Sequence, residues 1–261
     1  MVAMYHSVLI PHRNLHRRLD LCVWSLERSA LACGPADWEC VVIDSSEPPW
    51  ETASPVVRVV RQAQDGPYCK SRAYNHGLDA TDSEVVTFLD VDAIVGSRFL
   101  LGTCVLLDHS IIRACYRVRK LPPCEVEGIS LSANRDDYVA GLFEKYGEYP
   151  MAYEAYDHHD LNRPSKGKPW GNSQFSIRRR ALGDLRFDEA YAGRGQEDLD
   201  MNMQIEAAYR DKYQGFLWKD ADHAMFHLDR DADVDPLWID RKLLAKNASH
   251  YVKRRTALLG R

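Results

Sequence analysis

The chain has 261 residues, 45% hydrophobic and 28% charged, which is ordinary for a globular domain near the upper size limit of one hydrophobic core. The 38 acidic residues barely outnumber the 34 lysines and arginines, so the net charge of -4 favours neither nucleic-acid binding nor an acidic tail. The seven cysteines are irregularly spaced and include no C-x-x-C pair, which argues against a disulfide framework or a zinc cluster. We therefore expect reduced thiols in a soluble, cytoplasmic protein without a signal peptide or a membrane span.

Short apolar runs alternate with helical patterns in the first half of the chain. Strands are predicted at 8–10, 39–44, 56–60, 85–89 and 111–116. Helices are predicted at 15–32, 68–80 and 99–107. This alternation predicts a mostly parallel sheet with helices on both faces. Ligands of such sheets lie beyond the carboxyl ends of the strands, where Pro11, Asp44 and Asp90 stand.

The second half of the chain is less regular. Residues 118–169 show poor periodicity, so we predict loops and short helices that form an acceptor-side insertion or a lid. Patterning returns at Trp170, with helices predicted at 197–210 and 235–256. The expected single domain divides into a nucleotide-binding half at 1–117, the variable insertion at 118–169, an acceptor and catalytic half at 170–230 and a C-terminal helix at 235–261.

Two carboxylates spaced by one residue follow the strand predicted at 85–89. Asp90 and Asp92 can share a hard cation, because Mg²⁺ and Mn²⁺ take oxygen ligands and bridge carboxylates to a diphosphate. The D-x-D pattern is frequent by chance, so a pair of solvated turn aspartates is the alternative. His227 supplies an imidazole that can complete the same shell, although a lone histidine is more often structural.

Residues 70–77 (KSRAYNHG) open the helix that precedes this strand, and their cations and helix N-terminus can face phosphates. For Lys70 alone, a solvated helical face is the favoured interpretation. Asp44 can hydrogen-bond a nucleotide base or ribose, and ordinary turn chemistry is its alternative.

A second acidic cluster lies at 193–200 (GRGQEDLD), where a helix is predicted to begin. Acidic residues in a first helical turn complement the helix dipole without any further role. The functional alternative is that Glu197 or Asp198 accepts the proton of an attacking hydroxyl. The C-terminal helix is rich in cations, and we interpret it as a solvated basic face rather than a membrane contact. These cations are Lys242, Lys246, Lys253, Arg254 and Arg255.

In their order along the chain, these segments resemble family 2 GT-A glycosyltransferases. The C-terminal half resembles the galactosyltransferase-type catalytic region of β-1,4-galactosyltransferases and polypeptide N-acetylgalactosaminyltransferases. The matching segments are 7–11 (SVLIP), 71–77 (SRAYNHG), 88–92 (FLDVD), 170–177 (WGNSQFSI), 187–189 (FDE) and 195–200 (GQEDLD). The resemblance implies a GT-A fold, with one Rossmann-like, mostly parallel sheet flanked by helices, and leaves the 118–169 insertion unmatched.

The resemblance also implies roles for individual residues. The nucleotide-sugar donor would be held by Pro11, Asp44, Arg72, Asn75, Asp90, Gly171 and Asn172. Asp90, Asp92 and His227 would hold Mn²⁺ or Mg²⁺. Asp198 would be the catalytic base, with Glu197 beside it on sugar hydroxyls. The metal-binding methionine of similar galactosyltransferases has no counterpart, since Met225 precedes His227 by two residues rather than three. Their aromatic residue in the glycine loop is also absent, and Arg194 stands near that place.

The implied activity is an inverting transfer of a hexose or N-acetylhexosamine from a UDP-sugar to a hydroxyl acceptor. A glycan, a lipid-linked glycan, a protein or a modified nucleic acid can all serve as that acceptor. The alternatives are a retaining N-acetylhexosaminyltransferase on the same fold and a non-catalytic carbohydrate-binding relic. A sugar-phosphate nucleotidyltransferase is disfavoured because residues 11–14 (PHRN) lack the glycine-rich phosphate loop it would need.

Overall fold

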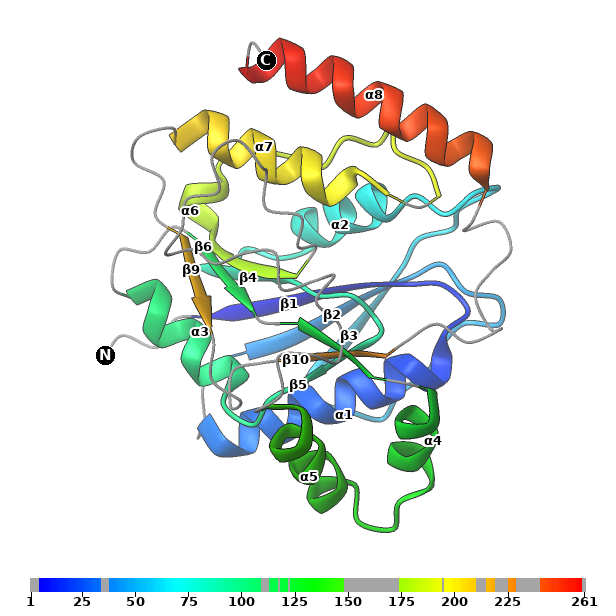
Figure 1. The fold of residues 1–261 in the computed structure, drawn as a ribbon, viewed down its shortest axis with the longest axis vertical. Helices are drawn as coiled ribbons and strands as arrows, with labels where there is room; N and C mark the ends of the chain where they lie inside the picture. Colours follow the sequence, from blue (N-terminus) through cyan, green and yellow to red (C-terminus); the bar gives the residue numbers. More distant parts are fainter. Residues whose placement is uncertain are drawn as a thin grey trace.

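The described residues form one main sheet and one smaller sheet. The computed structural model describes residues 5–33, 38–108, 113–116, 118–121, 123–147, 174–193, 195–209, 215–218, 225–228 and 240–259. Within these residues the main sheet has seven strands in the order β3-β2-β1-β4-β8-β6-β9 (Figure 1). Its strands are β1 His6–His12, β2 Trp38–Asp44, β3 Val57–Arg61, β4 Val85–Phe88, β6 Arg113–Tyr116, β8 Phe175–Arg178 and β9 Gly215–Trp218.

Most neighbouring strands of this sheet run parallel. β1 pairs in parallel with β2 and β4, β2 with β3, and β6 with β9. β8 is antiparallel to both of its neighbours, β4 and β6. The prediction of a mostly parallel sheet is therefore confirmed, and β8 is the strand that reverses direction.

Helices cover both faces of the sheet (Figure 1). On one face lie α2 Lys70–Asp79, α6 Arg179–Leu182 and α7 Glu197–Tyr209, with α8 Arg241–Leu259 outside them. On the other face lie α1 His16–Cys33, α3 Phe99–Asp108, α4 Pro123–Leu131 and α5 Arg135–Gly147. A smaller sheet in the order β5-β10-β7 is built from β5 Ala93–Val95, β10 Met225–Leu228 and β7 Val118–Leu121.

The period of the strands explains the two apolar cores. Successive side chains of a strand point to opposite faces, so a strand that helices cover on both sides buries consecutive apolar residues. On β1, Val8 and Ile10 pack in the core under α1 and α3, whereas Leu9 packs in the core under α2 and α7. All three side chains are fully buried. Each core draws on residues from both halves of the chain, for example Met225 on one face and Met201 on the other.

Some element boundaries differ from the prediction. The region predicted as loops and short helices from 118 contains strand β7 and the helices α4 and α5, and residues 148–173 lie outside the described residues. The described part of the C-terminal helix begins at Arg241, where the Asp240 carboxylate accepts hydrogen bonds from the backbone N–H groups of Lys242 and Leu243. An aspartate in this position is a helix N-cap. The predicted start at 235 lies outside the described residues. Within the described ranges, no helix is long and apolar enough to cross a membrane.

Helix α8 is attached to the domain through Asp200, which is buried, and Asp188, which is partly buried. Arg254 Nη2 donates to Asp200 Oδ2 at 3.0 Å, and Arg254 Nε lies 3.2 Å from Asp188 Oδ2. His250 Nε2 lies 2.8 Å from the same Asp188 oxygen. The Asp200 side chain is fully buried, so its negative charge needs the Arg254 guanidinium to compensate it. The interpretation of the helix as a solvated basic face is therefore wrong for Arg254.

We expect Arg254→Ala to destabilise the fold by about 2 kcal/mol, since it leaves the buried Asp200 carboxylate without its cationic partner. This magnitude lies below that of a fully buried ion pair because the Arg254 side chain is 31% exposed. Urea unfolding followed by circular dichroism measures the change in free energy. Lys253→Ala on the exposed face of the same helix is the control and is expected to stay within about 0.5 kcal/mol of the wild type. Equal stabilities of the two variants would contradict the anchoring role.

Candidate functional site

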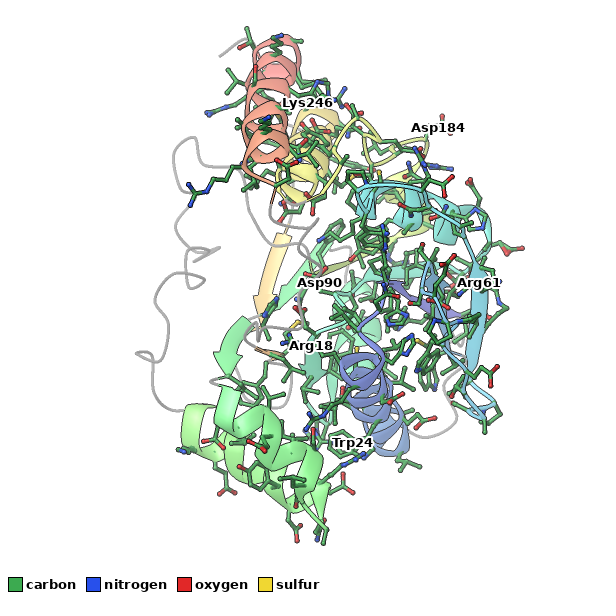
Figure 2. The ribbon with its side chains drawn as sticks, turned by 90° about the vertical axis from the view of Figure 1, so that its right-hand side faces the viewer. Arg18, Trp24, Arg61, Asp90, Asp184 and Lys246 are labelled. Carbon is green, nitrogen blue, oxygen red and sulfur yellow. The ribbon has the colours of Figure 1, made fainter. Side chains whose placement is uncertain are left out.

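Two carboxylates and an imidazole converge beyond the end of β4. One ligand atom from each of Asp90, Asp92 and His227 lies within 4.8 Å of the other two. His227 Nε2 is 3.1 Å from Asp92 Oδ1. The three side chains are between 12% and 17% exposed, so the group is partly buried. Figure 2 shows Asp90 at mid-height, between the α7–α8 layer above and α1 below. The chemistry of this donor set fits a divalent cation such as Mn²⁺ or Mg²⁺.

The smaller sheet explains how His227 reaches a site formed 135 residues earlier in the chain (227 − 92). β10 pairs antiparallel with β5, and this register sets His227 opposite Ala93, the residue after Asp92. The backbone N–H of Leu228 also donates to the carbonyl oxygen of Asp92 at 2.7 Å. The position of the imidazole is therefore fixed by strand pairing.

A buried lysine links this group to the second acidic cluster. The Lys70 ammonium lies 3.0 Å from Asp90 Oδ1 and 3.1 Å from Glu197 Oε1. Lys70 is 9% exposed and Glu197 4%. A glutamate that only complements a helix dipole would be solvated, whereas Glu197 is buried and ion-paired. The interpretation of Lys70 as part of a solvated helical face is wrong.

Electrostatics of the site follow from this burial. Burial disfavours the Lys70 ammonium, but the charges of Asp90 and Glu197 outweigh that effect and hold the Lys70 pKa well above its ordinary value. For Asp198, the next residue along α7, burial and the neighbouring Glu197 charge raise the pKa to about 6. Asp198 is therefore a carboxylate at neutral pH and a stronger base than an exposed aspartate.

A short loop with unusual backbone angles aims the start of α7 at the site. Gly195 has a φ of 98° and Gln196 a φ of 78°, a region that glycine enters freely and other residues rarely adopt. Two contacts hold this loop in place. Gly193 N–H donates to the Tyr68 carbonyl oxygen at 2.7 Å, and Asn247 of α8 donates from its side chain to the Ala192 carbonyl oxygen at 2.9 Å. The loop that contains the strained residue Gln196 is held by Asn247 of α8 and by Tyr68, which precedes α2. Backbone strain of this kind is typical of functional sites.

The carboxylate oxygens of Asp44 bind other groups of the protein. Its fully buried carboxylate accepts hydrogen bonds from the backbone N–H groups of Ser46 and Trp50, each at 2.9 Å, and it contacts the Arg61 guanidinium. Its Oδ1 is also 2.9 Å from His12 Nδ1. Burial opposes ionisation, but these hydrogen bonds outweigh it and lower the Asp44 pKa. A direct contact of Asp44 with a nucleotide stays a prediction.

The remaining predicted donor residues lie on β1 and α2 or outside the described residues. Pro11 is buried on β1, in register with Ile43. Asn75 clamps the 187–189 segment, since it donates to the Phe187 carbonyl oxygen at 2.9 Å and to Glu189 Oε1 at 3.0 Å. Arg72 Nε donates to Glu189 Oε2 at 3.2 Å. Gly171 and Asn172 lie outside the described residues.

Sequence reasoning missed several side chains that contact the acidic group. Besides Lys70, Tyr74 donates to Asp90 Oδ1 and Gln174 to Asp90 Oδ2, each at 3.4 Å. Arg18 on α1 lies 3.9 Å from Asp92 Oδ2. Lys70 and Tyr74 share one face of α2, four residues apart, and that spacing on the helix before D-V-D is the one signal that could have marked them. Gln174 lies in the matched segment 170–177, whereas no local signal exists for Arg18.

Residues 7–103 match the Glycosyl transferase family 2 model. The match covers 97 of the 261 residues and includes Lys70, Asp90 and Asp92, whereas Glu197, Asp198 and His227 lie beyond it. No curated protein sequence matches the chain at a significant level. The galactosyltransferase-type region expected in the C-terminal half stays a prediction.

Solved structures of other proteins share this fold. S. aureus TarS superposes with a TM-score of 0.57 at 14% identity, over 97% of this chain and 44% of that one. A structure of TarS 1–349 gives a TM-score of 0.58 at 12% identity, over 97% and 72% of the two chains. The mannosyltransferase PcManGT from Pyrobaculum calidifontis, in complex with GDP-Man and Mn²⁺, gives 0.52 at 16% identity, over 97% and 63%. This likeness confirms the GT-A fold, and the chain spans under half the length of the first of these proteins.

Proposed function

We propose that this chain is a metal-dependent glycosyltransferase that moves a hexose or N-acetylhexosamine from a UDP-sugar to a hydroxyl acceptor with inversion. The observation that carries the proposal is the Lys70 bridge. It brings the metal-ligating group at Asp90 and Asp92 next to the start of α7, which carries Asp198. A leaving-group site and a candidate base then face the same crevice. The family 2 match over residues 7–103 supports the donor half of the proposal.

On the donor side, Asp90, Asp92 and His227 would hold the cation. When bound, Mn²⁺ or Mg²⁺ would neutralise negative charge on the leaving diphosphate. The first turn of α2 offers further donors, because a helix N-terminus has unpaired N–H groups that bind anions. Ser71 Oγ in this turn is buried and has no hydrogen-bond partner among the described residues. The structure of PcManGT contains GDP-Man and Mn²⁺, which agrees with a nucleotide-sugar donor for this chain and adds a GDP-sugar to the candidates.

On the acceptor side, Asp198 takes the proton. The acceptor oxygen attacks the anomeric carbon, the bond from that carbon to the diphosphate oxygen breaks, and the nucleoside diphosphate leaves with the electron pair. The acceptor hydroxyl proton passes to the Asp198 carboxylate. A pKa of about 6 keeps Asp198 ionised at neutral pH and close to the value at which a general base is most effective.

The roles of the other predicted residues belong to the same proposal. Arg72 would approach the diphosphate from the first turn of α2, and the region 118–169 would face the acceptor. Pro11, Asp44 and Asn75 would shape the nucleotide side of the crevice mainly by fixing its walls. Gly171 and Asn172 would line the donor sugar.

Release of nucleoside diphosphate from a donor panel tests the proposal. UDP-glucose, UDP-galactose, their N-acetylamino forms and GDP-mannose are incubated with the full chain, once with Mn²⁺ and once with EDTA. We expect slow, metal-dependent hydrolysis of one donor, because water can replace the acceptor hydroxyl in such a site. Proton NMR of the sugar released then reports its anomeric configuration, and inversion is expected.

Each contrary outcome points to a specific alternative. Retention of configuration would favour the retaining N-acetylhexosaminyltransferase and remove Asp198 as the base. A chain that neither releases nor binds UDP or GDP in the presence of Mn²⁺ would be the carbohydrate-binding relic.

A further inference from the structure

Lys70 occupies the junction between two acidic groups that come from distant parts of the chain. Its ammonium is held at 3.0 Å by Asp90, at the end of β4, and at 3.1 Å by Glu197, the first residue of α7. The ammonium also lies over the Tyr74 ring, with Nζ 5.9 Å from the ring centroid. The Lys70 side chain is 10% exposed, so these contacts are buried ion pairs rather than surface ones.

The charge around this junction is strongly negative. Asp90, Asp92, Glu197 and Asp198 bring four carboxylates to one crevice, and like charges in a poorly solvated site repel one another. Lys70 and Arg18 both form ion pairs with these carboxylates. Arg18 lies on the Asp92 side at 3.9 Å, so the link between Asp90 and Glu197 falls to Lys70.

We propose that Lys70 is a positioning residue that acts as the internal counter-ion of the site. It holds the start of α7 against Asp90, and it competes with a divalent cation for the Asp90 carboxylate. This inference rests on the metal site of the proposed function and deepens it. With Asp90 already paired, the protein binds a free cation weakly, and the diphosphate oxygens of the donor supply the ligands that tighten binding. Metal and donor binding are thereby coupled through one side chain.

Titration with Mn²⁺ alone, without nucleotide, separates this role from simple damage to the site. The electron paramagnetic resonance signal of free Mn²⁺ gives the dissociation constant for the full-length wild type and for Lys70→Met, which keeps the apolar stem. We expect K70M to bind Mn²⁺ about ten-fold more tightly at pH 7.5, because the crevice loses a competing positive charge. K70R should bind like the wild type, and adding Asp92→Asn to K70M should remove the gain. If folded K70M binds Mn²⁺ as weakly as the wild type or more weakly, Lys70 does not compete with the cation for Asp90.

Thermal unfolding without metal tests the positioning role independently. K70M leaves Glu197 and Asp90 as buried charges without their shared cation, so its melting temperature should fall. Glu197→Gln removes one of these charges, and the K70M/E197Q double variant should melt closer to the wild type than K70M does. If the double variant melts no higher than K70M, Lys70 does not compensate the Glu197 charge and the proposal fails. The proposal also fails if E197Q folds but both K70M and the double variant do not.

The two measurements also separate this inference from the proposed function. Neither needs a donor or an acceptor, so a chain that transfers no sugar still gives both results. If neither wild type nor K70M binds Mn²⁺, the metal site and the competition are both refuted, and the unfolding series alone decides the positioning role.

Discussion

Asp198→Asn is expected to lower the rate of sugar transfer about 1,000-fold, the loss typical of removing a general base, while nucleotide binding stays unchanged. Asparagine keeps the size of the side chain and the acceptor oxygen that Leu199 N–H contacts at 2.9 Å, but it cannot take a proton. Single-turnover transfer with the donor identified in the panel measures the rate, and fluorescence or calorimetric titration measures nucleotide affinity.

The wild-type pH profile should carry the signature of the same carboxylate. Because the Asp198 pKa is raised to about 6, the base is protonated below that pH, and the rate should fall tenfold per unit as the pH decreases further. The residual activity of D198N should not show this fall in rate below pH 6. A wild-type rate that stays constant from pH 7 to 5 would remove Asp198 from the mechanism.

The melting temperature reports the raised pKa of Asp198 without any substrate. Folding raises the Asp198 pKa, so its ionised form opposes folding at pH values above about 6. D198N should therefore melt at a higher temperature than the wild type above pH 6. The difference should shrink as the pH falls toward about 4, where aspartate becomes protonated in the unfolded chain as well.

Asp184→Asn is the matched control for these experiments. Asp184 is exposed in the turn after α6, and Figure 2 shows it well away from Asp90. The variant removes one carboxylate from the chain without touching the crevice. Both its rate and its melting temperature should equal those of the wild type, and a D184N defect as large as that of D198N would make the loss nonspecific.

Asp92→Asn is expected to weaken Mn²⁺ binding on the order of 100-fold, since it removes a charged ligand from a group with two carboxylates. His227→Ala should weaken binding less, because it removes a neutral ligand. The same Mn²⁺ titration that compares wild type with K70M measures both variants, with D184N as the control. Unaltered Mn²⁺ affinity in D92N would place the cation elsewhere in the protein.

The two metal-site variants also differ in what they do to the structure. Asp92 lies near Arg18 and His227, so D92N leaves a cation without part of its counter-charge. H227A removes a side chain from a strand whose position depends on backbone pairing with β5, and that pairing stays intact. Circular dichroism of both variants should match the wild type, and this result assigns any loss of Mn²⁺ binding to the ligands themselves.

Much of the fold is readable from local pattern. The continuous apolar runs at Val8–Ile10 and 39–44 predict buried strands, and the helical spacing from 15 to 32 predicts α1 within one residue at each end. These signals are local because a strand repeats every two residues and a helix every 3.6. The small strands β5 and β10 escaped prediction, since three or four residues carry too little periodicity to be distinguished from a loop.

The sequence by itself determined the strands β1 to β4 and β6, the helices α1 to α3 and α7, the carboxylates after β4 and the acidic first turn of α7, because each depends on residues adjacent in the chain. Only the tertiary structure decided that Lys70 is buried between Asp90 and Glu197, that His227 stands beside Asp92, and that Arg254 pairs with Asp200. The physical reason is the same in each case. An ion pair needs two side chains to meet in space, and strand register and helix packing set that meeting across tens to more than a hundred residues.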